Sequence, residues 1–196
     1  MLKRSFDIAV SFILLVALSP FLLIIALVVK LSSPGPALFK PVRVGLNGQP
    51  FTMYKFRSMR VGGEKDWIKR FDPAKMGDFV FQTEDDPRIT KTGRWLRRTS
   101  LDELPNLLNV LRGNMSLVGP RPEEPEVAAH YSPEMRRRLE VKPGITGLAQ
   151  ISGRGELPLK DVIAKDLEYV DRHSILIDLV ILIKTPFTVG SRRGAL

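Results

Sequence analysis

The segment IAVSFILLVALSPFLLIIALVV (residues 8–29) contains no charged residue and is interrupted near its middle by Ser19 and Pro20. As one straight helix, its 22 residues would be ~33 Å long, enough to cross a hydrocarbon core of ~30 Å. Pro20 lacks an N–H group and disfavours helical geometry at Ser19, so we expect a kink. The Ser19 hydroxyl can donate to a carbonyl oxygen that the kink leaves free.

The charges on both sides of this segment favour a hairpin. Lys3 and Arg4 precede it and Lys30 follows it, so the positive-inside tendency places both ends on the cytoplasmic side. Split at Pro20, the arms of 12 and 10 residues each reach ~15–18 Å, about one leaflet. We therefore predict a re-entrant helix, with a transmembrane anchor and a cleaved signal peptide as the alternatives.

The composition limits the class of protein. The 196 residues suffice for one domain with a core. The absence of cysteine excludes disulfides and thiolate metal sites, and two histidines are too few for a recognisable zinc site. The net charge of +9 indicates an anionic partner, which could be nucleic acid, anionic lipid or a nucleotide-linked substrate.

A β-hairpin is predicted in VRVGLNGQPFTMYKF (42–56). Apolar and polar residues alternate on both sides of Asn47 and Gly48, a pair typical of a type I′ turn. Pro41 and Pro50 favour edge positions.

Helices are predicted in the rest of the chain. The segment 62–71 allows a short amphipathic helix, and 132–141 resembles a short basic one. Residues 175–184 are apolar on nearly all sides and end before Pro186, which is typical of a buried core helix or of one in the membrane interface. Because a membrane segment lies at the other end of the chain, we favour the interface. A further helix would bury one face that consists of Leu104, Leu107, Leu108 and Leu111.

The adjacent carboxylates Asp102 and Glu103 lie among several arginines in residues 94–123. One interpretation is a capping box from Ser100 to Glu103, although Pro105 favours a helix that begins closer to Asp102. The other is phosphoryl chemistry, in which a carboxylate attacks phosphorus or binds Mg²⁺ together with substrate phosphates.

Three further segments carry candidate phosphate-binding side chains. GPRPE (119–123) fixes Arg121 between two prolines, and a guanidinium fork there suits a phosphate. KPGITGLAQISGRG (142–155) combines glycines with Arg154, and YKFRSMR (54–60) contains Lys55 and Arg57. A proline-rich turn, a plain loop and a solvated basic strand are the respective structural alternatives.

Together these pieces resemble the small monotopic phosphoglycosyl transferases of the bacterial sugar transferase family. The resemblance covers nearly the whole chain but not residues 61–84, whose role it leaves open. Its blocks are KRSFDIAVS (3–11), SSPGPALF (32–39), RVGLNGQPFTMYKFRSM (43–59), DPRITKTGRWLRRTSLDELPNLLNVLRGNMSLVGPRP (86–122), KPGITGLAQISGR (142–154) and YVDRHSILIDLVILIKT (169–185).

The resemblance implies a two-step reaction. Asp102 would attack the β-phosphate of a UDP-sugar, form a covalent phosphosugar intermediate and release UMP, and undecaprenyl phosphate would then accept the phosphosugar. Glu103 would assist as a base or by orienting phosphate and Mg²⁺, the expected cofactor, which Asp102 would bind. The residues expected to contact substrate phosphates are Lys55, Arg57, Arg97, Arg121 and Arg154.

The expected protein is α+β, with a re-entrant helix in residues 1–31 and a catalytic domain in residues 32–196. We expect it on the cytoplasmic face of a bacterial inner membrane, bound to lipid and without nucleic acid; a homodimer is among the assemblies that the sequence allows. Membrane-tethered nucleic-acid binding and a scaffold role are the alternative functions. The sugar, the glycan pathway and the division of labour between Asp102 and Glu103 are not readable from the sequence.

Overall fold

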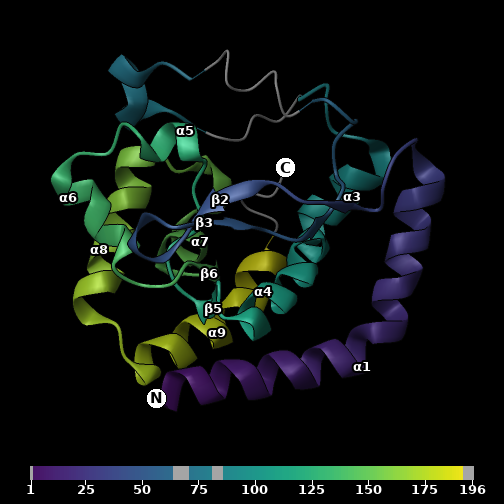
Figure 1. Cartoon of the computed structure of the whole chain (residues 1–196), viewed down its shortest axis with the longest axis horizontal. Coiled ribbons are helices and arrows are strands. Elements are labelled where there is room, and N and C mark those ends of the chain that lie inside the picture. The colour runs from purple at the N-terminus through teal and green to yellow at the C-terminus, as the bar shows by residue number, and fades with distance from the viewer. Residues whose placement is uncertain (1, 64–70, 81–85, 192–196) are drawn as a thin grey trace.

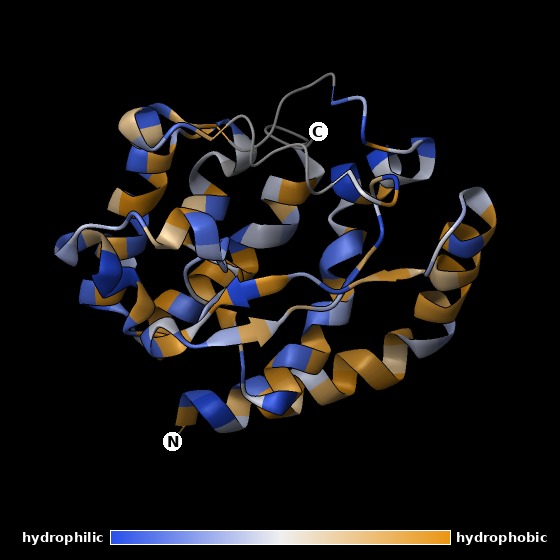
Figure 2. Ribbon diagram, turned by 45° about the horizontal axis from the view of Figure 1, so that its top comes forward, coloured by the Kyte–Doolittle hydropathy of each residue, from blue (hydrophilic) through white to orange (hydrophobic). Residues whose placement is uncertain are grey.

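The computed structural model describes residues 2–63, 71–80 and 86–191, apart from the side chain of Arg154. Helix α1 (Leu2–Ser32) runs along one side of the molecule, turns, and continues along a neighbouring side (Figure 1). The remaining helices and strands form a body that lies inside this angle. Within the described residues, α1 is the one helix long and apolar enough to cross a membrane, and apolar residues dominate it (Figure 2).

The turn in α1 has the predicted chemical cause. Pro20 lies inside the helix and has no N–H to donate to the carbonyl oxygen of Val16. The hydroxyl of Ser19 donates to that oxygen at 2.8 Å. The kink and its repair by serine are therefore confirmed.

The first turns of α1 are bound to the body by polar side chains. The Lys3 ammonium lies 2.5 Å from the buried carboxylate of Asp178, and the buried Asp7 carboxylate accepts from the Leu117 N–H at 3.2 Å. The Arg4 guanidinium donates to the carbonyls of Val110 and Leu111.

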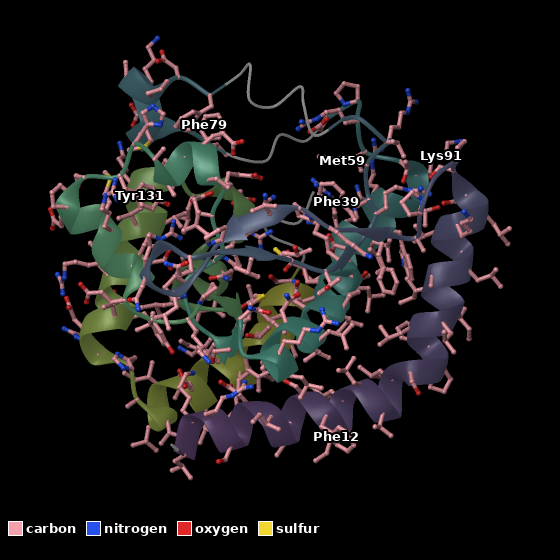
Figure 3. All side chains as sticks on the ribbon, in the orientation of Figure 1. Phe12, Phe39, Met59, Phe79, Lys91 and Tyr131 are labelled. Carbon is pink, nitrogen blue, oxygen red and sulfur yellow. The ribbon has the colours of Figure 1, made fainter. Side chains whose placement is uncertain are left out.

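The last turn of α1 is bound to the same body. Arg57, which is only 5% exposed, donates to the carbonyl of Val29 at 3.0 Å and to the backbone of Ser33 and Pro34 at 2.7 and 2.9 Å. Between the two attachments the helix exposes large apolar side chains, and Figure 3 shows Phe12 pointing away from the body. Both ends of α1 therefore lie against one folded unit.

Short strands form three pairs in the described part of the chain. The predicted hairpin is confirmed, because Asn47 and Gly48 both have positive φ, 54° and 77°, as a type I′ turn requires. The antiparallel pairs are β1 (Leu38–Phe39) with β4 (Lys55–Phe56) and β2 (Val42–Val44) with β3 (Pro50–Thr52), and the parallel pair is β5 (Ser116–Val118) with β6 (Gly144–Thr146).

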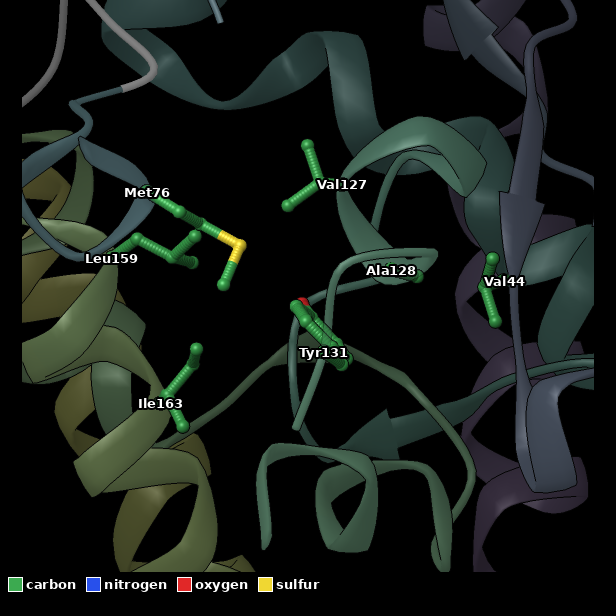
Figure 4. Close-up of a cluster of buried hydrophobic side chains, with 7 residues drawn as sticks. All are labelled: Val44, Met76, Val127, Ala128, Tyr131, Leu159 and Ile163. Atoms are coloured by element: carbon green, nitrogen blue, oxygen red, sulfur yellow. The ribbon is translucent and has the colours of Figure 1, made fainter. Parts of the chain in front are cut away.

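Helices surround these strands and bury three apolar clusters, one of which joins Val44, Val127, Tyr131 and Leu159 (Figure 4). The α-helices after α1 are α3 (Lys91–Thr99), α4 (Leu107–Arg112), α5 (Pro125–Ala128), α6 (Pro133–Arg136), α7 (Leu148–Ser152), α8 (Leu159–Arg172) and α9 (Ile175–Gly190). The 3₁₀ segments are η1 (Leu46–Gly48), η2 (Pro73–Asp78), η3 (Leu101–Asn106), η4 (Arg137–Leu139) and η5 (Arg154–Glu156).

Three local predictions need correction. α9 continues through Pro186 to Gly190, and α4 begins only at Leu107. Leu108 is 38% exposed, because the 3₁₀ turn before α4 shifts the buried face to Leu107 and Val110. Most of the predicted amphipathic helix at 62–71 falls outside the described residues.

The α+β class is confirmed by these elements. The basic helix at 132–141 is present as α6 and η4, with the Ser132 hydroxyl accepting from the Met135 N–H. The division into 1–31 and 32–196, the re-entry of α1 and the interfacial position of α9 stay predictions. α9 does expose a row of apolar side chains, which includes Leu176, Val180, Ile183 and Phe187.

Candidate active site

Asp102 and Glu103 lie in η3, a tight turn between α3 and α4. Ser100 ends α3 in the left-handed conformation with φ of 55° and makes no side-chain cap to the following turn, so the capping-box interpretation is wrong. Pro105 lies within the turn and has no N–H, which disfavours a regular α-helix before Leu107. The local sequence thus holds the two carboxylates in a turn.

Asp102 is buried at the wall of a cavity of about 870 Å³. A cation close to it is Lys55 at the start of β4, whose Nζ lies 3.6 Å from Asp102 Oδ2. At this separation the two groups form an ion pair without a short hydrogen bond. The Asp102 carboxylate therefore remains available for other partners.

Glu103 is held at both oxygens. Arg121 donates to Oε1 at 2.8 Å, and the Asn106 amide donates to Oε2 at 3.1 Å. Asn106 is fully buried, which fixes its amide in turn. The two adjacent carboxylates thus differ in kind, since Glu103 is locked in place and Asp102 is not.

The pKa values of the two carboxyl groups shift in opposite directions. Burial raises the pKa of Asp102, and the positive charge of Lys55 only partly offsets it. Burial also raises the pKa of Glu103, but the positive charges of Arg121 and Lys55 outweigh this effect, so the pKa of Glu103 is lowered. Burial lowers the pKa of Lys55, against the attraction of Asp102. Glu103 is thus the more firmly ionised carboxylate.

Arg97 of α3 lines the same cavity. Its Nε donates to the Ser58 hydroxyl at 3.0 Å, and its two terminal nitrogens make no hydrogen bond to the residues that the structure describes. Burial lowers its pKa, while the charge of Asp102 raises it. Arg97 therefore presents a positive fork at the carboxylate pair.

Arg121 lies on a loop that packs backbone against backbone with β6. A Cβ on Gly119 would lie 2.3 Å from the Lys142 carbonyl, and one on Gly144 would lie 2.1 Å from the Gly119 nitrogen. Only glycine permits this approach. The loop thereby carries Arg121, between its two prolines, to the cavity.

The cavity brings together most of the predicted site residues. Two of the predicted residues differ from the others. Arg57 lines the cavity but directs its terminal nitrogens to the carbonyls at the end of α1, and the side chain of Arg154 lies outside the described part. The contact of Arg57 with a substrate phosphate stays a prediction, while in this structure its terminal nitrogens cap the end of α1. The predicted residues that line the cavity are Lys55, Arg57, Arg97, Asp102, Glu103 and Arg121.

The sequence did not reveal Asn106 and Ser58 as partners of site residues. Asn106 follows the carboxylates by three and four positions, so a helical spacing rule could have suggested its contact with Glu103. Ser58 meets Arg97 only through the tertiary fold and gives no local signal.

The donor set at the carboxylates fits Mg²⁺. This ion takes one or two carboxylates and completes its shell with water and substrate phosphates. Asp102 is such a carboxylate, whereas Glu103 is occupied by Arg121 and Asn106. Among the described residues no cluster of three acidic or histidine side chains forms a complete metal cage. The fit therefore relies on oxygen atoms that a phosphate substrate would bring.

The site thus consists of two adjacent carboxylates surrounded by cations, on a folded body that is joined to a long apolar helix. A comparison with protein families agrees with this arrangement. A model of the family described as bacterial sugar transferase matches residues 1–192. The chain belongs to the bacterial sugar transferase family.

Several curated proteins are similar to this chain. The undecaprenyl-phosphate glucose phosphotransferase of Komagataeibacter xylinus is 45% identical over 194 residues, which cover 93% of this chain and 35% of that protein. The UDP-glucose:undecaprenyl-phosphate glucose-1-phosphate transferase of Escherichia coli (strain K12) is 44% identical over 199 residues, which cover 95% of this chain and 40% of that protein.

A shorter relative matches nearly end to end. The exopolysaccharide production protein ExoY of Sinorhizobium fredii is 42% identical over 197 residues, which cover 98% of this chain and 87% of that protein. The chain thus spans well under half the length of the two larger relatives and most of ExoY.

Proposed function

We propose that this protein transfers a sugar 1-phosphate from a UDP-sugar to undecaprenyl phosphate and releases UMP, as the first membrane step in the assembly of a polysaccharide or glycoconjugate. The names of the relatives support the reaction class. The observation that carries the proposal is the difference between two adjacent carboxylates. Among the described residues Asp102 has only its 3.6 Å ion pair with Lys55 at the cavity wall, whereas Glu103 is fixed by Arg121 and Asn106.

Asp102 is the proposed nucleophile. One of its oxygens attacks the β-phosphorus of the UDP-sugar, and the bond from that phosphorus to the bridging oxygen breaks, so that UMP leaves with this oxygen. An aspartyl phosphosugar remains. An oxygen of undecaprenyl phosphate then attacks the same phosphorus and restores the Asp102 carboxylate. Because burial raises the Asp102 pKa, the ionised carboxylate is more basic than an exposed one.

The surrounding cations stabilise charge on the transferred group. Lys55, Arg97 and Arg121 line one cavity with Asp102, and such donors act most strongly away from water. Glu103 holds Arg121 in this set through its 2.8 Å ion pair. Mg²⁺, bound by Asp102 and substrate oxygens, would neutralise diphosphate charge.

We propose that α1 enters the membrane and returns. Both of its ends are bound to the same body, through Lys3 and Asp7 at the start and Arg57 at the end. A helix crossing the bilayer would place these ends on opposite faces, where a single body could not bind both. The basic flanks favour the cytoplasmic face of a bacterial membrane. The site would then meet both the lipid phosphate and the soluble nucleotide.

Intact mass spectrometry tests the proposal. We expect the detergent-purified protein, mixed with Mg²⁺ and a panel of UDP-sugars, to gain the mass of one sugar phosphate and to release UMP. Asp102→Asn should not gain this mass. Arg172→Met, which changes an exposed side chain far along α8, serves as the matched control and should form the adduct normally.

The same experiment separates the alternatives. Absence of an adduct with every sugar, together with no UMP release when undecaprenyl phosphate is added, would contradict the proposal. Salt-sensitive binding of DNA or RNA in that case would favour the nucleic-acid alternative. A normal adduct in Asp102→Asn would refute the role of Asp102 alone.

A further inference from the structure

Arg138 in η4 is a buried arginine next to the candidate site, and only 2% of it is exposed. Its NH1 donates to Glu123 Oε2 at 3.0 Å and to the Tyr131 hydroxyl, which itself donates to Glu123 at 2.9 Å. Its NH2 lies 2.5 Å from Asp166 Oδ2. Two buried carboxylates thus neutralise one buried guanidinium, as burial of a charge requires.

A fourth contact of Arg138 is with the loop of residues 119–123, which carries Arg121. Its NH2 donates to the backbone carbonyl of Arg121 at 3.1 Å. The side chain of the same Arg121 donates to Glu103 at 2.8 Å in the cavity. One residue is therefore held by its backbone from the interior while its guanidinium reaches the carboxylates.

The rest of the loop is fixed on either side of Arg121. The Gly119 N–H donates to the Thr146 carbonyl at 2.9 Å, and the Pro120 carbonyl accepts from the Gly144 N–H at 2.8 Å. The Glu123 carbonyl accepts from the Val44 N–H at 2.9 Å. Because residue 122 is proline, it offers no N–H there. The hydrogen bond from Arg138 thus fixes the backbone at the centre of the loop, at the residue whose side chain extends to Glu103.

We propose that Arg138 is a positioning residue of the transfer reaction, which orients Arg121 toward Glu103 and the transferred phosphate by holding the Arg121 carbonyl. The inference rests on the proposed function. The residue acts through Arg121 and does not itself touch substrate. Asp166 and Glu123 fix the plane of its guanidinium from two sides, so its donors point in set directions.

The geometry requires an arginine at this position. Two separate nitrogens of one planar group reach Glu123 on one side and both Asp166 and the Arg121 carbonyl on the other. A lysine has a single nitrogen and cannot span these partners, although it keeps the charge. Arg138→Lys therefore removes the hold while leaving positive charge in the cluster.

A double-mutant cycle with Arg121 tests the inference. We expect Arg138→Lys to slow adduct formation about 100-fold, the effect of a displacement of ~1 Å in a catalytic group. In the Arg121→Ala background the same change should slow adduct formation less than about twofold. The adjacent Arg137→Lys, which alters an exposed ion pair with Asp171, is the matched control and should leave the rate unchanged.

Equal slowing by Arg138→Lys in both backgrounds would overturn the inference, since a merely structural role does not depend on Arg121. If Arg138→Lys does not fold, Asp166→Asn takes its place in the cycle, because the amide keeps the shape of the carboxylate and weakens the orientation of Arg138. Coupling of Asp166→Asn to Arg121→Ala supports the inference, and additive effects overturn it.

Hydrogen exchange provides a readout that does not depend on activity. The amides of residues 119–124 should exchange faster in Arg138→Lys, while peptides from α4 and α8 keep their protection. Unchanged exchange in this loop would overturn the inference even if the rate falls. If the unmodified protein forms no adduct at all, the proposed function fails, and hydrogen exchange still decides whether Arg138 holds the loop.

Discussion

Replacing Arg57 with methionine is expected to destabilise the protein and to leave substrate affinity unchanged. The guanidinium is buried, and its two terminal nitrogens donate to the chain where α1 ends, at Val29, Ser33 and Pro34. A hydrogen bond from a charged donor contributes about 1.5–3 kcal/mol. If each of the two nitrogens counts as one effective hydrogen bond, Arg57→Met lowers the free energy of unfolding by ~3–6 kcal/mol.

The lower end of this range is expected, because Pro34 is exposed and water can replace the donor to its carbonyl, whereas Val29 is buried. In a chain of this size, 1 kcal/mol corresponds to roughly 2–4 °C. A loss of about 3 kcal/mol therefore lowers the melting temperature by ~6–12 °C.

Two measurements on the same preparation check this result. Thermal unfolding in detergent gives the stability, and UMP release at varied UDP-sugar concentration gives KM. Arg172→Met is the control, because its exposed i,i+4 pair with Glu168 contributes only ~0.3–0.5 kcal/mol. An unchanged melting temperature with a raised KM would refute the capping role and favour the predicted contact of Arg57 with a substrate phosphate.

Three further predictions follow from contacts described above. Gly119→Ala should greatly reduce the yield of folded protein, measured by solubility and circular dichroism, because the new Cβ would lie 2.3 Å from the Lys142 carbonyl oxygen. A normal yield would contradict the close backbone packing at Gly119. Pro20→Ala restores an N–H that can donate to the Val16 carbonyl, so α1 should straighten and cross the membrane. An N-terminal tag should then be exposed on the far side of sealed vesicles. A tag that stays protected would argue against the proline as the cause of re-entry. Chelation of Mg²⁺ by EDTA should abolish UMP release. It should change the melting temperature by no more than ~1 °C, because the described residues form no metal cage that contributes to folding. Activity that persists in EDTA would show that the reaction does not need Mg²⁺.

The sequence predicted the features whose cause is local. The Ser19–Pro20 kink and the Asn47–Gly48 turn depend on the conformations that these residues allow on their own, so the structure confirms both. The carboxylate pair was also identified, because adjacent acidic residues among arginines are visible in one short stretch.

The features that the sequence did not reveal depend on contacts between distant segments. Arg57 looked like its basic neighbours, but the end of α1 lies against it, 28 positions away in sequence from Val29. Arg138 belongs to a run of three arginines in the predicted basic helix, and only Arg138 of that run is fully buried, against Asp166 of α8. A charge pattern cannot show which member of a basic run the fold turns inward.

The attachment of both ends of α1 to one body has a consequence for how the protein reaches its place in the cell. The proposed hairpin, inserting from one side, would carry no charged loop through the hydrocarbon layer, so its insertion would need no transport of polar chain across the membrane. The contacts of Lys3 and Arg57 form only when the body has folded, since their partners come from segments that are distant in sequence. The folding of the body would thus complete the shape of the proposed hairpin, and the depth of its apex in the membrane would be set from the aqueous side.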